Sequence, residues 1–201
     1  MIKKWLAALC LMPLGMAQAL ALNLEELSAR LERPSLVAGS FEQEKFLIGF
    51  PKPLKTQGEY TFWADHGIVW ETKSPFNSKM ILTPTQLRSV SDYQERSVSS
   101  EDNPHLRVLN QLLIGLMQGD VKVISEHFNI ALNETNSLWQ MLLMPKDKNI
   151  KMVFVKILIE GDKEVKALRF YSPNGDLTVI NLKDEHHPEN VPQDLQIHNK
   201  Q

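Results

Sequence analysis

The sequence contains a single cysteine, Cys10, so it cannot form an intrachain disulfide. A chain of this size can bury an adequate core without such a link. Charge of one sign is not in excess, because 22 basic and 24 acidic side chains give a formal net charge of −2. Nucleic-acid-binding proteins carry a basic patch, and none occurs in this sequence. The composition therefore argues against a nucleic-acid partner.

Sequence motifs for catalysis and for metal binding are also lacking. There is no glycine-rich phosphate loop, no nucleophile elbow and no paired-carboxylate motif. His186 and His187 are adjacent, so in an extended segment they would point in opposite directions. The other histidines are isolated: His66, His105, His127 and His198. We therefore expect a protein that is not an enzyme and that needs neither a metal nor a cofactor.

Long apolar runs are limited to one, residues 5–16, which is shorter than the roughly 20 residues of a membrane-spanning helix. Lys3 and Lys4 precede this run, and the small-residue pattern Ala19-Leu20-Ala21 follows it. This layout is typical of a secretory signal peptide. We expect cleavage after Ala21 or after Ala19; an uncleaved anchor is the alternative.

The remaining segment, residues 22–201, is long enough for one domain with a sizeable core. No stretch within it is apolar enough to span a membrane. The sequence therefore predicts cleavage of residues 1–21 and export of a single monomeric domain to the periplasm, without a stable membrane span.

The domain begins with a short amphipathic helix at residues 23–33, capped by Asn23 and ended by Pro34. Alternating or apolar segments then predict strands at 36–46, 54–63, 67–73, 80–83, 87–91, 128–132, 138–144, 150–160, 165–171 and 177–184. Asn174-Gly175 indicates a hairpin turn between the last two. Residues 186–201 are polar and are expected to form a loosely attached tail.

Consecutive strands with short connections favour an antiparallel sheet, and a sheet of this many strands curls or closes. The predicted fold class is mainly β with helices (α+β). Its expected form is a curved antiparallel sheet, or half-open β-barrel, with helices across one mouth.

One internal helix is predicted to start at Asp102-Asn103-Pro104 and to end near Gly119. It is apolar around most of its circumference and must be covered on most sides. Two interpretations remain open: it is part of the core, or it covers a cavity that takes a lipid. The candidate lid residues share one face: Leu106, Leu109, Leu113 and Leu116. Methionines, which suit adaptable apolar surfaces, occur at Met80, Met117, Met141, Met144 and Met152.

Several motifs, in order, resemble the outer-membrane lipoprotein carrier family (LolA-like). Ser40-Phe41-Glu42-Gln43-Glu44-Lys45 matches an S-F-x-Q-x-K segment that follows an opening helix. A glycine-led strand, a strand containing tryptophan and a proline follow as Gly58-Glu59-Tyr60-Thr61-Phe62, Gly67-Ile68-Val69-Trp70-Glu71 and Pro75-Phe76. Residues 139–146, WQMLLMPK, are similar to the family's later W-x-L-x-L-x-P-K strand.

The resemblance implies an unclosed antiparallel barrel with a helical lid and an apolar cavity for acyl chains. It also implies a lipoprotein cargo, an inner-membrane donor transporter and an outer-membrane acceptor. The candidate cavity residues are Phe41, Tyr60, Phe62, Ile68, Trp70, Met80, Leu82, Met141 and Leu143. The family's arginine-proline pair, whose arginine holds the lid, is replaced here by Ala64 and Asp65.

The expected function is a periplasmic carrier that moves lipoproteins from the inner to the outer membrane. Two alternatives remain. One is a carrier of another lipid, a glycolipid or a lipophilic pigment. The other is a periplasmic module of the same fold that senses lipoproteins without shuttling them.

Overall fold

The computed structural model describes residues 23–31, 35–91, 94–99, 112, 114, 115, 117, 118 and 120–196. The predicted signal peptide, residues 1–21, and the residues that would surround its cleavage after Ala21 lie outside these ranges.

The first element is the expected short helix, α1 (Leu24–Arg30). The Asn23 side chain accepts a hydrogen bond from the Glu26 backbone N–H at 2.9 Å, and the Glu26 carboxylate accepts one from the Asn23 N–H. This capping box satisfies backbone donors that the first turn leaves without partners. Leu27 and Leu31 are buried, so the helix presents its apolar side to the rest of the domain.

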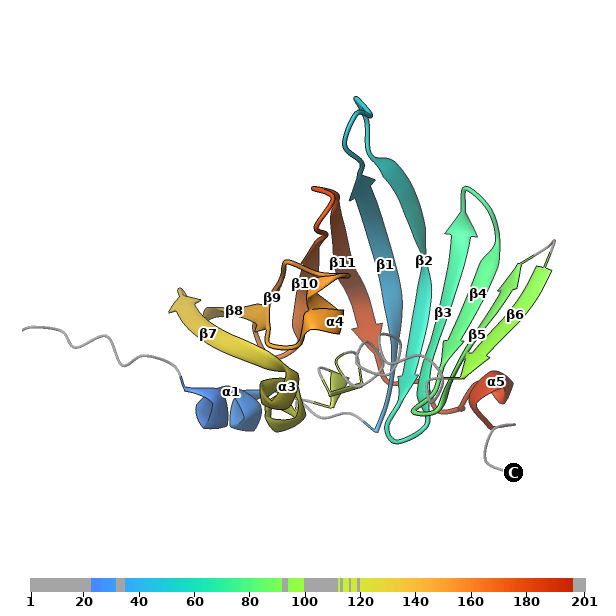
Figure 1. Ribbon diagram of the computed structural model, residues 1–201. Helices are drawn as coiled ribbons and strands as arrows, with labels where there is room; N and C mark the ends of the chain where they lie inside the picture. Colours follow the sequence, from blue (N-terminus) through green and yellow to red (C-terminus); the bar gives the residue numbers. More distant parts are fainter. Residues whose placement is uncertain are drawn as a thin grey trace, which may run out of the picture.

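The main body is one antiparallel sheet, in which the described part of the chain forms eleven strands. They are β1 (Leu36–Phe46), β2 (Leu54–Trp63), β3 (Gly67–Ser74), β4 (Ser78–Leu82), β5 (Gln86–Ser91), β6 (Gln94–Ser99), β7 (Phe128–Thr135), β8 (Leu138–Pro145), β9 (Lys156–Gly161), β10 (Val165–Tyr171) and β11 (Leu177–His186). The spatial order is β6-β5-β4-β3-β2-β1-β11-β10-β9-β8-β7. The first and last strands of this order do not pair, so the sheet stays open, as Figure 1 shows. The predicted fold class is confirmed.

Two strand predictions differ from the structure. Residues 150–160, predicted as one strand, form the short helix α4 (Lys148–Lys151), a turn and then β9. Asp147 caps α4 by accepting a hydrogen bond from the Asn149 N–H at 2.6 Å, and this local bond competes with extended backbone. Strand β6 was not predicted, because its sequence, QERSVS, has little apolar alternation. Pairing with β5 holds it in the sheet instead.

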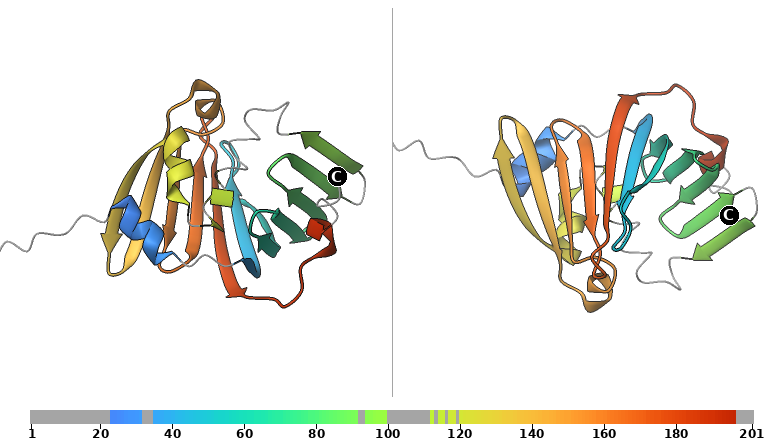
Figure 2. Two further views of the ribbon diagram at one scale, coloured as in Figure 1. Left: turned by 90° about the horizontal axis from the view of Figure 1, so that it is seen from below. Right: turned by 90° about the horizontal axis from the view of Figure 1, so that it is seen from above.

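Helices cover part of the sheet on one face, which we call the inner face. Residues of α1 and of α3 (Val121–His127) pack in one core cluster with Phe128, Trp139 and Phe170 of the sheet. Viewed along the vertical axis of Figure 1, the two helices lie across the β7–β10 half of the sheet (Figure 2). That half is therefore filled by helix–sheet packing.

The predicted loose tail is wrong for the residues that the structure describes. Strand β11 continues to His186, and the chain then forms α5 (Gln193–Gln196). Leu195 is 1% exposed and packs against Val69 and Ile81 on the outer face of the sheet. Asp194 adds an ion pair with Lys79 at 2.7 Å. A single leucine in a polar segment gave too weak a pattern to predict this docking.

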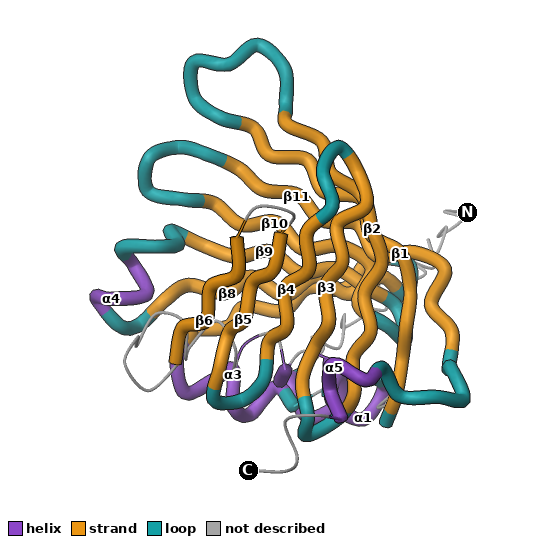
Figure 3. Tube along the Cα trace, turned by 90° about the vertical axis from the view of Figure 1, so that its right-hand side faces the viewer, coloured by secondary structure: helices purple, strands orange, loops and turns teal. Residues whose placement is uncertain are grey.

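The connections between strands lie at the two ends of the strands, and the helices gather at one of these ends. Figure 3 shows α1, α3 and α5 near the end of the molecule that is lowest in the view. The β1–β2 and β10–β11 turns lie toward the opposite, upper end, and the connection that contains α4 lies on the left below them. The alternating direction of antiparallel strands places these three connections, together with the β3–β4 turn, at the same end of the strands.

Candidate functional site

An apolar cavity of about 50 Å³ lies on the inner face of the sheet. One wall comes from β2, β3 and β4, through Tyr60, Ile68, Trp70, Met80 and Leu82. The opposite wall comes from β10 and β11, through Val165, Leu168, Ile180 and Leu182. Met117, from a helical stretch between β6 and α3, completes the lining. The two halves of the sheet thus meet around one apolar space.

Five of the nine predicted cavity residues line this space, namely Tyr60, Ile68, Trp70, Met80 and Leu82. Phe41 lies next to it, because its ring stacks on Trp70 with a centroid separation of 3.9 Å. Phe62 is fully buried in one cluster with Ile68 and Leu82. Met141 and Leu143 are also fully buried, in the cluster that includes α1 and α3, and they do not line the cavity.

The strand motifs of the sequence account for the packing beside the cavity. Phe41 pairs in register with Gly58 of β2. A Cβ atom on Gly58 would meet the Phe41 ring at 2.9 Å and the Glu71 carbonyl oxygen at 1.9 Å. The glycine that begins the G-E-Y-T-F motif therefore leaves room for the Phe41 ring and for the neighbouring strand. This arrangement lets Phe41 reach Trp70.

The polar end of Tyr60 is turned away from the apolar space. Its hydroxyl donates a hydrogen bond to Glu185 Oε2 at 3.3 Å. Glu185 lies within a register shift in the β1–β11 pairing, next to Asp184 at φ 54°, and such irregularities redirect side chains. The hydroxyl thus finds a partner, while the Tyr60 ring stays in the cavity wall.

The same contact changes the titration of both groups. Burial and the nearby Glu185 carboxylate raise the pKa of Tyr60 above its ordinary value. Burial, followed by the negative charge of Glu164, raises the pKa of Glu185, although its bond with Tyr60 opposes this rise. The charged form of each group is therefore disfavoured in the folded protein.

The predicted lid residues Leu106, Leu109, Leu113 and Leu116 lie outside the described residues. Of the surrounding stretch, residues 112, 114, 115, 117 and 118 are described, and we refer to these as the 112–118 segment. Leu112 is 2% exposed and packs in the cluster that contains α1 and α3. Ile114 and Met117 pack against the cluster that contains Phe62 and Leu82. The segment thus bridges the two halves of the inner face.

A polar contact fixes the end of the 112–118 segment to the sheet. Gln118 Nε2 donates a hydrogen bond to Asp65 Oδ1 at 3.0 Å. Asp65 lies in the β2–β3 turn with φ 62°, a left-handed conformation that aspartate tolerates better than most residues. This turn is where the resemblance expects an arginine-proline pair. Asp65 here accepts a hydrogen bond from the segment that covers the cavity.

The cavity is small for a lipid. An engineered core cavity of about 150 Å³ takes up benzene, which is smaller than an acyl chain of about a dozen carbons. At about 50 Å³, the space in this structure is a third of that size. An acyl chain can enter only if part of the wall moves, and Met117 is the lining residue that does not belong to the sheet.

Among the residues described here, no group of three or more His, Cys, Asp or Glu side chains is arranged to hold a metal ion. The helices of this same part of the chain include none with the length and apolar character needed to cross a membrane.

Comparison with solved structures finds similar chains of low sequence identity. A LolA superfamily protein from Nitrosomonas europaea is 9% identical, with a TM-score of 0.46, and the match covers 84% of this chain and 93% of that one. A DUF1329 family protein from Desulfovibrio piger is 10% identical, with a TM-score of 0.48 and coverage of 84% and 92%. LprF from Mycobacterium bovis is 12% identical, with a TM-score of 0.39 and coverage of 85% and 94%.

A search of curated protein sequences gives no match. The family model described as "Outer membrane lipoprotein carrier protein LolA-like" matches residues 16–183, which is most of the chain. This match spans the strands that line the cavity and the S-F-x-Q-x-K, G-E-Y-T-F and W-x-L-x-L-x-P-K motifs. The chain belongs to the LolA-like family of outer membrane lipoprotein carrier proteins.

Proposed function

We propose that this protein is a periplasmic carrier that shelters the acyl chains of lipoproteins on the inner face of its open sheet. The observation that carries the proposal is the cavity itself, whose lining is apolar and comes from both halves of the sheet. The polar hydroxyl of the one tyrosine in the lining is occupied by Glu185. The family description adds support for a lipoprotein cargo.

The length of the acyl chain determines how much free energy the carrier must supply to shelter it. Burying a methylene group is worth about 0.8 kcal/mol, so an acyl chain of about a dozen carbons needs shelter worth about 10 kcal/mol. A small closed cavity cannot provide this, whereas the inner face can if Met117 and the Gln118–Asp65 contact give way. In this proposal the closed form is the unloaded carrier, and the cargo stabilises an open form to which it binds more tightly.

The family description supports a proposed pathway for the cargo. The carrier takes its cargo from a donor transporter at the inner membrane and releases it to an acceptor at the outer membrane. The carrier itself needs no cofactor and catalyses no reaction. It is exported by its N-terminal signal peptide and acts as a monomer.

The test is the identity of what the native protein holds. The protein is purified from the periplasm of a Gram-negative host, and its bound molecules are identified by native mass spectrometry. We expect lipoprotein or acylated peptide, and the purified protein should take up a fluorescent fatty acid with about one-site saturation. Met117→Trp, which fills the cavity, should reduce uptake at least tenfold, whereas Met144→Trp, at a position 43% exposed, should not.

Three outcomes would change the proposal. A glycolipid or pigment in the native protein, without lipoprotein, would make it a carrier of a different cargo. Capture of a lipoprotein without protection of its acyl chains from solvent would indicate a sensing module. Failure of the protein to take up any acyl chain would contradict a carrier of either kind.

A further inference from the structure

Most of the exposed apolar side chains lie at one end of the strands, opposite α1, α3 and α5. Ten large hydrophobic residues are exposed in the described part of the chain, and seven of them lie in two places at this end of the strands. Four belong to the β1–β2 hairpin, and three belong to the segment between α4 and β9. They are Phe46, Ile48, Phe50, Leu54, Met152, Val153 and Val155. An eighth, Phe76, lies at the same end in the β3–β4 turn.

These connections are neighbours in space and form one surface. The Ile48 N–H donates to Asp176 Oδ1 at 3.1 Å, and the Ile48 side chain lies close to Gly175 in the β10–β11 turn. The Val155 N–H donates to the Tyr171 carbonyl oxygen at 2.7 Å, and Lys156 Nζ lies 4.4 Å from the Tyr171 ring centroid. We call residues 44–55, 147–156 and 171–177 the apolar rim.

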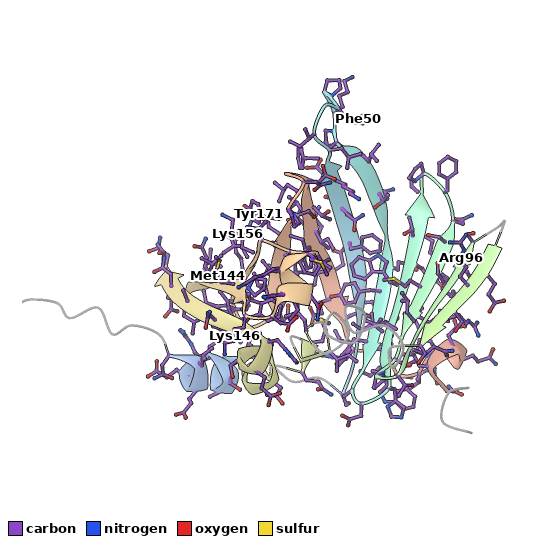
Figure 4. All side chains as sticks on the ribbon, in the orientation of Figure 1. Phe50, Arg96, Met144, Lys146, Lys156 and Tyr171 are labelled. Carbon is purple, nitrogen blue, oxygen red and sulfur yellow. The ribbon has the colours of Figure 1, made fainter. Side chains whose placement is uncertain are left out.

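The β1–β2 hairpin extends farthest from the body of the molecule. Figure 4 shows Phe50 at its outer end, beyond the other strand ends of the sheet, whereas Lys156 and Tyr171 lie lower, on the left of the view. Ile48 is 70% exposed and Phe50 is 65% exposed. Gly49, at φ 86°, allows the tight turn between them, and Pro51 and Pro53 restrict the backbone that follows. Removing such apolar side chains from water is favourable, and no other described segment covers them.

The charge of the rim is opposite to that of the rest of the chain. Its three segments contain six lysines, namely Lys45, Lys52, Lys55, Lys148, Lys151 and Lys156. They contain only three carboxylates, Glu44, Asp147 and Asp176, so the rim carries a formal charge of +3 within a chain of −2. The remaining 16 basic and 21 acidic side chains give −5 elsewhere. An anionic surface therefore attracts the rim and repels the rest of the molecule.

We propose that the apolar rim docks on anionic phospholipid bilayers, with Ile48 and Phe50 entering the interface and the lysines facing the headgroups. Apolar side chains beside lysines are the combination that binds reversibly to such interfaces. A docked molecule presents its rim to the bilayer, and α1, α3 and α5 lie at the far end. This inference concerns a surface separate from the cavity and does not depend on the cargo.

The test is co-sedimentation of the full chain with vesicles of phosphatidylcholine containing about 30% phosphatidylglycerol. We expect binding to these vesicles that weakens as salt is raised from 50 to 500 mM, and little binding to pure phosphatidylcholine. The double substitution Ile48→Ser with Phe50→Ser should reduce partitioning at least tenfold. Leu138→Ser is the matched control, because Leu138 is 55% exposed but lies at the β7–β8 hairpin, at the opposite end of the strands.

A second measurement reports insertion directly. Phe50→Trp should show a shift of fluorescence emission to shorter wavelength when anionic vesicles are added, while Leu138→Trp should not. Fatty-acid uptake by the cavity should be unchanged in the Ile48→Ser, Phe50→Ser variant, which separates membrane docking from cargo binding.

Other outcomes would overturn the proposal. These are failure of the wild-type protein to bind anionic vesicles, or an equal loss of binding with Leu138→Ser. If the rim substitutions instead change the oligomeric state measured by light scattering, with vesicle binding intact, the rim is an interface between copies of this chain.

Discussion

Replacing two methionines with alanine distinguishes a ligand cavity from an ordinary core. Met141 is 0% exposed and packs in the cluster beneath α1 and α3, whereas Met117 is half-buried and lines the cavity. Met141→Ala removes a fully packed side chain and leaves a closed void, which costs about 2–5 kcal/mol. Met117→Ala enlarges a space that already exists and removes a side chain that is only partly buried. We expect a cost of about 1–2 kcal/mol for it.

The volume of the cavity gives an estimate of how much stability the empty space costs. At about 24 cal/mol per Å³, an empty space of about 50 Å³ costs about 1 kcal/mol of stability. A ligand that fills it recovers this amount in addition to its own burial. Saturating fatty acid should therefore raise the urea midpoint of the wild-type protein, and by more in Met117→Ala, where the space is larger.

The assay measures urea unfolding and the affinity for a fluorescent fatty acid in both variants. Met141→Ala should show the greater loss of stability with an affinity within about twofold of wild type. Met117→Ala should show the smaller loss, with an affinity changed at least threefold. Equal stability losses with unchanged affinity in both variants would refute the reasoning, because the space beside Met117 would then be a core void.

Three further predictions concern other contacts. Because burial raises the pKa of Glu185, the unfolded chain ionises first as pH rises, so this residue lowers stability above its ordinary pKa. Glu185→Gln, which keeps an acceptor for Tyr60, should raise the urea midpoint at pH 7, with the difference vanishing below pH 4; a difference independent of pH would contradict this. Leu195→Ala should release α5 and speed proteolysis of the C-terminus, with exposed Gln193→Ala as the control; equal cleavage rates would argue against docking. Gly58→Ala should lower the free energy of unfolding by about 1–3 kcal/mol, because its Cβ would overlap neighbouring atoms. A neutral effect would refute the close approach.

Much of the fold could be predicted from the sequence because most of its strands are indicated by local sequence patterns. Residues 36–46, 54–63 and 165–171 alternate or cluster in ways that few other structures allow, and all three are strands with the predicted bounds. Strand β6 and helix α5 could not be predicted, since neighbouring strands stabilise them. Helix α4 depends on a single capping side chain, Asp147, inside a segment with an extended pattern.

The site could be predicted only in part. Tyr60, Ile68, Trp70, Met80 and Leu82 lie on strands adjacent in sequence, and strand alternation places them on one face. Val165, Leu168, Ile180 and Leu182 were missed, because β11 pairs with β1 across more than a hundred residues. The alternation of Ile180 and Leu182 was visible, but nothing in it indicated which strands they would face.

The position of Met141 and Leu143 illustrates the same limit. Their strand matches the family motif, and both side chains are buried on the inner face. Helices α1 and α3 fill the space above that half of the sheet, so these residues lie in the packed core of this structure. Which inward-facing residues meet a helix and which meet a cavity depends on where the helices lie across the sheet.

The most direct test of the central claim is quenching of tryptophan fluorescence by brominated fatty acid. Variants of the exported protein that keep only Trp70 or only Trp139, with its other tryptophans replaced by phenylalanine, report on the two halves of the inner face. Trp70 lines the cavity, and Trp139 is 1% exposed in the packed half. We expect saturable quenching of Trp70 by the brominated chain, relative to the unbrominated one, and little quenching of Trp139. Quenching of neither tryptophan, or of both equally, would contradict an acyl-chain site in this cavity.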